Sequence, residues 1–199
     1  MIRTALALML SATPALATQE YILPTLFDVA RVAPGDVLNI RADPNGSAPV
    51  IGTLAPDATG IEVVEERRGW GRVNTGEGSG WVSLRFLDYR TDVWEEDALP
   101  AGWQCFGTEP FWTVIPQEDQ LVTAMPGLAD DMRPLRAVRS TGVFRDPTRA
   151  VTAPGMTLTS TPQLCSDGMS DRLFGLQALV VIEGEEGTTL LSGCCSIQP

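Results

Sequence analysis

Short apolar runs recur along most of the chain, and turns rich in glycine, proline, asparagine and aspartate separate them. In residues 38–41 two apolar residues alternate with Asn39 and Arg41, which is the period of a half-buried strand, and a turn follows at residues 43–46. Comparable runs occupy residues 26–32, 50–54, 61–65, 70–74 and 80–83. Because several short strands of this kind bury one face together, we expect a small β-barrel in the first half of the chain.

The second half of the chain has the same character. Its apolar runs lie at residues 111–115, 121–124, 137–144, 156–159, 174–182 and 188–191, again with turns between them. None of these runs keeps a helical period over several turns. The fold class that this pattern predicts is all-β, with a second antiparallel β-barrel or sandwich after the first barrel.

Acidic residues and a proline interrupt the pattern between residues 91 and 101, and they predict a linker there. We therefore expect a first domain over residues 18–90 and a second domain over residues 102–199. Trp94 is unusual for a free tether, which suggests that the linker lies against one of the domains.

Residues 1–17 have the composition of a secretory signal peptide. Arg3 supplies a positive charge, residues 5–10 are apolar, and residues 15–17 form a small-residue cleavage site. We expect the mature chain to begin at Thr18 and to lie in the periplasm or outside the cell. No later run approaches the roughly 20 apolar residues that cross a bilayer, so no membrane span is expected.

The chain is acidic, with 14 basic and 25 acidic residues and a net charge of −11. Such a surface repels phosphate backbones and anionic lipids, so nucleic acid and membrane surfaces are not expected as partners. Every basic residue is arginine, and the chain has neither histidine nor lysine. Nucleophile systems that depend on histidine or lysine, P-loops and histidine metal sites are therefore excluded, and we expect no cofactor, no metal and no catalytic residue.

Several motifs of the first domain occur in an order typical of one family. They are Leu-Asn-Ile-Arg at 38–41, Val-Ile-Gly-Thr-Leu at 50–54, Gly-Trp at 69–70 and Gly-Trp-Val at 80–82, closing on Phe-Leu at 86–87. Over residues 26–90 the chain resembles the bacterial SH3 family. The resemblance implies a binding module in the cell envelope and places Trp70 and Trp81 near the ligand groove. A tryptophan suits a peptide or sugar ligand, and it suits the core of a small barrel equally well.

All four cysteines lie in the second domain: Cys105, Cys165, Cys194 and Cys195. An even number in an exported chain predicts disulfides, although four cysteines allow three connectivities. Adjacent residues of a strand point to opposite faces, so Cys194 and Cys195 are expected to take different partners. We favour Cys165 with Cys194 and Cys105 with Cys195. The exchanged pairing and a four-cysteine zinc site are the alternatives.

Two further stretches of the second domain form a distinctive signature, Phe-Gly-Thr-Glu-Pro-Phe-Trp at 106–112 and Cys-Ser-Asp-Gly-Met-Ser-Asp-Arg at 165–172, with Gly-Cys at 193–194. They resemble uncharacterised exported bacterial proteins that carry Glu-Pro-Phe-Trp and Cys-x-Asp-Gly-Met-Ser-Asp motifs. The candidate ligand-binding residues in them are Glu109, Trp112, Asp167, Asp171 and Arg172. Carboxylates beside an arginine suit a peptide amine or a cation, or serve as acid and base. In the alternative interpretation the acidic residues belong to turns and caps, and the aromatic residues divide between core and surface.

These features predict an exported, non-catalytic binding protein whose SH3-like module binds a peptidoglycan stem peptide or an envelope protein. One alternative is an inhibitor of a basic wall-cleaving enzyme such as lysozyme, because the chain is acidic and disulfide-bonded. A second alternative is an envelope hydrolase that uses Glu109 and Asp167.

Overall fold

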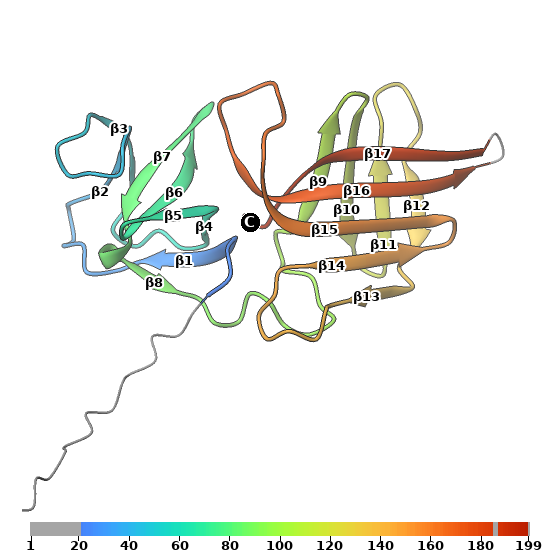
Figure 1. Ribbon diagram of the computed structural model, residues 1–199, viewed down its shortest axis with the longest axis horizontal. Helices are drawn as coiled ribbons and strands as arrows, with labels where there is room; N and C mark the ends of the chain where they lie inside the picture. Colours follow the sequence, from blue (N-terminus) through green and yellow to red (C-terminus); the bar gives the residue numbers. More distant parts are fainter. Residues whose placement is uncertain (1–20, 185–186, 199) are drawn as a thin grey trace, which may run out of the picture.

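The computed structural model describes residues 21–184 and 187–198, which form 17 strands and one short 3-10 helix (Figure 1). No α-helix occurs among these residues, and the strands pair in three antiparallel sheets. The predicted all-β fold class is therefore confirmed. The predicted signal peptide at residues 1–17, with cleavage before Thr18, lies outside the described residues.

Two sheets of three and five strands form the first part of the chain, drawn in blue to green in Figure 1. The smaller sheet has the order β4-β1-β8, and the larger one has the order β3-β2-β7-β6-β5. Their elements are β1 Thr25–Val29, β2 Leu38–Arg41, β3 Val50–Leu54, β4 Ile61–Val63, β5 Glu65–Arg67, β6 Trp70–Thr75, β7 Gly78–Ser83, the 3-10 helix η1 Leu84–Phe86 and β8 Leu87–Tyr89.

The alternation in the sequence produces the core of these two sheets. Leu38 and Ile40 of β2 point inward and meet Val73 of β6 and Val82 of β7, and all four side chains are buried. The intervening residues of β2 stay half-exposed, as the period of two requires. The predicted barrel-like packing of short strands is thus formed by Leu38 and Ile40, the alternating residues that predicted it.

Two of the predicted runs in this part depart most from the observed strands. The run expected at residues 26–32 ends at Val29, because Arg31 adopts a left-handed backbone with φ of 60°, which a strand does not accommodate. The run at residues 61–65 is divided between β4 and β5. Val64 lies between them, and its amide still donates to the carbonyl of Arg72 at 3.0 Å.

Nine strands of the second part form one sheet in the order β12-β11-β10-β9-β17-β16-β15-β14-β13. Their bounds are β9 Gln104–Thr108, β10 Phe111–Gln117, β11 Gln120–Ala124, β12 Asp131–Pro134, β13 Ala137–Arg139, β14 Arg149–Ala153, β15 Met156–Cys165, β16 Phe174–Gly184 and β17 Gly187–Ser196. The edge strands β12 and β13 follow each other in the sequence. Between them, Leu135 donates its amide to Asp119 and Arg136 donates its amide to Thr152, so both halves of the sheet are tied to one segment.

The sheet curves around a single core, to which both halves contribute. Val114 and Leu121 come from β10 and β11, whereas Leu158 and Val180 come from β15 and β16, and all four are fully buried. The apolar runs at residues 111–115, 121–124, 156–159, 174–182 and 188–191 coincide with strands, and the run at 137–144 forms a strand only over its first residues. Strands β9, β12 and β14 were not predicted. β9 contains Gly107 and β12 is largely polar, and both features weaken a strand pattern.

Two disulfides link the strands of this sheet, Cys105 with Cys195 and Cys165 with Cys194. The predicted disulfide bonding is confirmed, and the pairing is the one that the sequence favoured. Cys105 and Cys195 face each other directly across β9 and β17. Because Cys194 and Cys195 are adjacent in β17 and point to opposite faces, they hold two different elements to one strand.

Residues 91–101 pack against the second part of the chain. Trp94 is buried, and its indole nitrogen donates to the Pro24 carbonyl at 2.8 Å. The guanidinium of Arg149 lies over the Trp94 ring at 4.9 Å and donates to the carbonyls of Glu95 and Ala98 at 2.7 and 2.8 Å. These contacts fix the segment, whereas the division of the chain into domains at residues 91–101 stays a prediction.

The loop between β15 and β16 lies beside the β6–β7 hairpin, as Figure 1 shows near its centre. The Asn74 side chain donates to the Leu173 carbonyl at 2.8 Å and accepts from the Leu173 amide at 3.0 Å. The Asp171 amide donates to the Glu77 carbonyl at 2.9 Å. These hydrogen bonds connect the β6–β7 hairpin of the first part to the β15–β16 loop of the second part.

Candidate functional site

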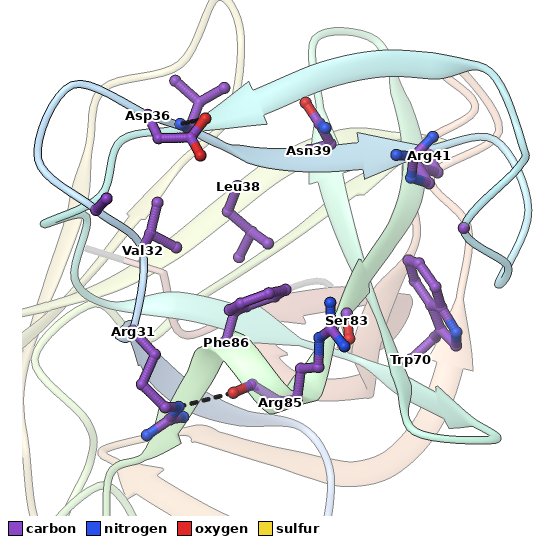
Figure 2. A pocket seen from close by; sticks show the side chains of 13 residues that line it. Arg31, Val32, Asp36, Leu38, Asn39, Arg41, Trp70, Ser83, Arg85 and Phe86 are labelled. Carbon is purple, nitrogen blue, oxygen red and sulfur yellow. Dashed lines mark hydrogen bonds between the residues drawn. The ribbon is translucent and has the colours of Figure 1, made fainter.

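A groove of about 760 Å³ opens on the first part of the chain. The segment that leads into β2 forms one side, and the beginning of β6 together with η1 forms the other (Figure 2). Its lining residues are Arg31, Val32, Ala33, Asp36, Val37, Leu38, Asn39, Arg41, Gly46, Trp70, Ser83, Arg85 and Phe86. A groove of this volume, with both apolar and polar walls, has the size of a small-ligand or short-peptide site.

The apolar part of the groove includes Val32, Leu38, Phe86 and Trp70 (Figure 2). Leu38 belongs to the core, whereas Val32 and Phe86 are half-buried and pack against that core. Trp70 is also half-buried, so part of its ring faces the solvent. A partly exposed indole offers contact area to a ligand, and the ring has few rotatable bonds to order when a ligand binds.

Arg31 is a structural residue at the edge of this groove. Its guanidinium donates to the carbonyls of Arg85 and Leu87 at 2.7 and 2.8 Å, and it forms an ion pair with Asp88 at 2.6 Å. The first of these bonds is drawn in Figure 2. Arg31 therefore ties the segment before β2 to η1 and β8, and its charge is already paired.

Two other arginines of the groove present their charge differently. Arg41 donates one hydrogen bond to the Ala48 carbonyl at 2.7 Å, which leaves most of its guanidinium hydrogens free of protein partners within the described residues. The guanidinium of Arg85 lies over the Phe86 ring at 4.4 Å, and in the described part of the chain it has neither an ion pair nor a hydrogen bond. A guanidinium of this kind is available to an acceptor on a ligand.

The family resemblance placed both tryptophans near a groove, with the core as an equal alternative, and the structure gives them different positions. Trp70 lines the groove. Trp81 does not, because it is 3% exposed and lies beneath the guanidinium groups of Arg67 and Arg72, at 5.2 and 5.0 Å from its ring centre. Trp81 faces Arg72 across the β6–β7 pair, so the contact with Arg72 follows from the register of the hairpin, whereas Arg67 reaches the ring from β5.

The candidate residues of the second part do not form one site. Glu109 and Asp167 line a shallow depression of about 630 Å³, and Arg172 lines a smaller neighbouring one of about 330 Å³ with Asp167. Asp171 lines neither depression and lies beside the β6–β7 hairpin. Trp112 is buried in the core.

The carboxylate of Asp167 is engaged in its own turn. It accepts hydrogen bonds from the amides of Met169 and Ser170 at 3.0 and 3.1 Å and from the Ser170 hydroxyl at 3.2 Å. Burial opposes ionisation of Asp167, but these bonds outweigh it, so its pKa lies below the ordinary range. This geometry favours the interpretation of Asp167 as a turn residue over that of an acid or a ligand-binding group.

Packing around Trp112 accounts for part of the signature that the sequence singled out. A Cβ on Gly107 would overlap the Trp112 indole, and a Cβ on Gly193 would overlap the Phe106 carbonyl and approach the same indole. Gly107 of β9 and Gly193 of β17 therefore give the indole its place over the sheet. The Trp112 indole therefore explains why Gly107 and Gly193 carry no side chain.

The described part of the chain holds no group of three or more histidine, cysteine, aspartate or glutamate side chains arranged to bind a metal ion. Within residues 21–184 and 187–198, no helix has the length and apolar character that crossing a membrane requires.

Sequence reasoning missed Arg41, Arg85 and Phe86 as groove residues. Arg41 occupies the outward position of a strand that the sequence did predict, so the alternation itself was the available signal. Arg85 and Phe86 lie on η1, whose single turn has no periodic pattern, and nothing in the sequence indicated that they face β2.

The short strands packed around a small core form a compact β-barrel-like module, and its groove carries an aromatic residue beside the mouth. Residues 36–88 match the family model of the bacterial SH3 domain, and this confirms the predicted resemblance over that region. The match covers the greater part of the groove lining and identifies a binding-domain family. No match was found among curated proteins or among solved structures. The resemblance that was inferred for residues 102–199 gains no support from these comparisons.

Proposed function

We propose that the chain is an exported, non-catalytic binding protein whose SH3-like groove takes a peptidoglycan stem peptide or a peptide segment of an envelope protein. The observation that carries this proposal is the coincidence of the groove with the region matched by the bacterial SH3 family. A non-catalytic role is in keeping with a binding-domain family and with a chain that lacks histidine and lysine.

The lining of the groove suits an extended peptide. Trp70 and Phe86 offer apolar contact to a side chain, while Asn39 on β2 and Ser83 at the end of β7 add polar side chains to the lining (Figure 2). Asn39 has both a donor and an acceptor, and Ser83 has a hydroxyl that serves as either. A peptide backbone presents alternating donors and acceptors, so these groups match its requirements.

Export is supported by the covalent chemistry of the second part of the chain. Both disulfides are formed, and such bonds persist in oxidising compartments such as the periplasm. The basic and apolar composition of residues 1–17 points in the same direction.

The proposal is tested by sedimentation of the purified full chain with insoluble peptidoglycan. Wild type is expected in the pellet, and Trp70→Ala is expected in the supernatant because the aromatic wall of the groove is removed. Phe111→Ala is the matched control, because Phe111 is exposed on β10 and does not line the groove. If Trp70→Ala pellets as well as wild type does, the groove is not the wall-binding site.

A second candidate function is inhibition of a basic wall-cleaving enzyme such as lysozyme. A separate cavity of about 530 Å³ is lined by exposed side chains of Val143 and Phe144 and by more acidic than basic residues, Asp92, Glu95, Glu96 and Asp146 against Arg145 and Arg149. Carboxylates around exposed apolar groups favour a basic protein surface. This candidate predicts that wild type inhibits lysozyme in a salt-sensitive way and that Glu95→Gln inhibits it less. If lysozyme lyses cells at the same rate with and without the wild-type protein, the candidate fails.

A further inference from the structure

The charge of the groove is opposite to that of the chain. The whole chain has a net charge of −11, yet the groove is lined by three arginines, Arg31, Arg41 and Arg85, and by one acidic residue, Asp36. A local excess of positive charge in a groove attracts an anionic group that comes close, whereas the acidic surface repels extended polyanions.

The unpaired part of this charge belongs to Arg41 and Arg85. Asp88 forms an ion pair with Arg31, as described above, so the charge of Asp88 offsets that of Arg31. The Asp36 carboxylate accepts a hydrogen bond from the Val37 amide at 2.8 Å and lies at the far end of the groove from Arg41 (Figure 2). The remaining positive charge is therefore concentrated near Trp70.

The position of these two arginines defines where an anion fits. Figure 2 shows the Arg85 side chain extending between Phe86 and Trp70, while Arg41 lies beyond the Trp70 ring on β2. A ligand side chain that contacts Trp70 and Phe86 thus brings its neighbouring polar groups toward a guanidinium on either side. Stacking on Phe86 also holds Arg85 in place, which lowers the ordering cost when an acceptor binds.

We propose that the groove selects ligands with a carboxylate next to an apolar side chain, with Arg85 as its main partner and Arg41 as the second. This inference rests on the proposed function and specifies its ligand class. A planar guanidinium binds a carboxylate through two parallel hydrogen bonds, which adds geometric selectivity to the charge attraction. A peptide supplies such a group at its C-terminus or on an acidic side chain.

The test uses soluble muropeptides released from purified peptidoglycan, before and after conversion of their carboxylates to carboxamides. Their binding to the full-length protein is measured by calorimetry. Wild type is expected to bind the amidated form at least about tenfold more weakly than the native form. Arg85→Gln is expected to lose most of this difference and Arg41→Gln a smaller part of it. Arg136→Gln, which changes an exposed arginine outside the groove, is expected to keep it.

Each outcome has a defined meaning. Equal affinity of wild type for both forms overturns the carboxylate inference while the proposed peptide binding stands. If neither form binds, the proposed cell-wall ligand fails, and the inference that rests on it fails too. A preference that survives unchanged in both Arg85→Gln and Arg41→Gln overturns the assignment to these arginines. When the carboxylate preference is observed, stem peptides with a single amide, at the C-terminus or on a side chain, identify which carboxylate is bound.

Discussion

Glu62 of β4 is a carboxylate buried between the two parts of the chain. The residue is 4% exposed, and its Oε2 accepts a hydrogen bond from the Ser196 hydroxyl at 2.6 Å. Its second oxygen has no side-chain or backbone partner within the described residues. Burial raises the pKa of Glu62 to about 7, although bonds from Ser196 and the following backbone and the charge of Arg172 partly oppose this.

The raised pKa makes stability depend on pH in a defined direction. A carboxyl whose pKa is higher in the folded state favours folding when protonated. The full stability is therefore present below its ordinary pKa of 4.5 and is lost as the pH rises through about 7. The shift from 4.5 to about 7 corresponds to about 3 kcal/mol, because each pKa unit is worth about 1.4 kcal/mol. Replacement by glutamine keeps the size of the side chain and removes the charge.

We therefore expect Glu62→Gln to be more stable than wild type by up to about 3 kcal/mol at pH values above about 7, and the difference to shrink toward pH 4.5. Urea denaturation followed by tryptophan fluorescence at several pH values measures this. The control is Glu109→Gln, which changes an exposed carboxylate and is expected to leave the pH dependence unaltered. A pH-independent difference between Glu62→Gln and wild type would refute the account of a buried, proton-linked carboxylate.

Three further changes test the packing of the second part of the chain. Gly107→Ala is expected to lower the free energy of unfolding by about 2 kcal/mol in chemical denaturation, because the new Cβ overlaps the Trp112 indole, whereas Gly46→Ala in open space is expected to be neutral. Arg149→Met is expected to cost about 3 kcal/mol and to speed amide exchange in residues 93–99, since the carbonyls of Glu95 and Ala98 lose the buried guanidinium that donates to them; unchanged exchange there would contradict this. Reduction of the disulfide between Cys105 and Cys195, which are 90 residues apart, is expected to cost about 4 kcal/mol, and an unshifted urea midpoint in reductant would contradict this.

Hydrophobic alternation was sufficient to predict most of the fold. Leu38 and Ile40 alternate with polar residues, and these inward positions are the ones that the structure buries. The adjacent cysteines were also informative, because opposite faces of one strand require two different partners. Such patterns work because they depend on the local geometry of a strand alone.

The candidate site could be predicted only in part, because tertiary contacts decide it. Trp70 and Trp81 each follow a glycine, yet only the pairing of β5, β6 and β7 places Trp81 under two arginines and leaves Trp70 at the groove. Glu62 occupies an alternating position that the sequence would assign to solvent. It is buried because residues 196–198, more than a hundred positions later, cover it.

The groove as the ligand-binding site is tested most directly by NMR titration of the full-length protein with native muropeptides. The account predicts that backbone and indole signals shift at Arg41, Trp70, Arg85 and Phe86, while the signals of residues 102–184 stay in place. The same titration of Trp70→Ala is expected to show no saturable shifts. Saturable shifts confined to residues 102–184, with unchanged signals around Trp70, would contradict the assignment of binding to the SH3-like groove.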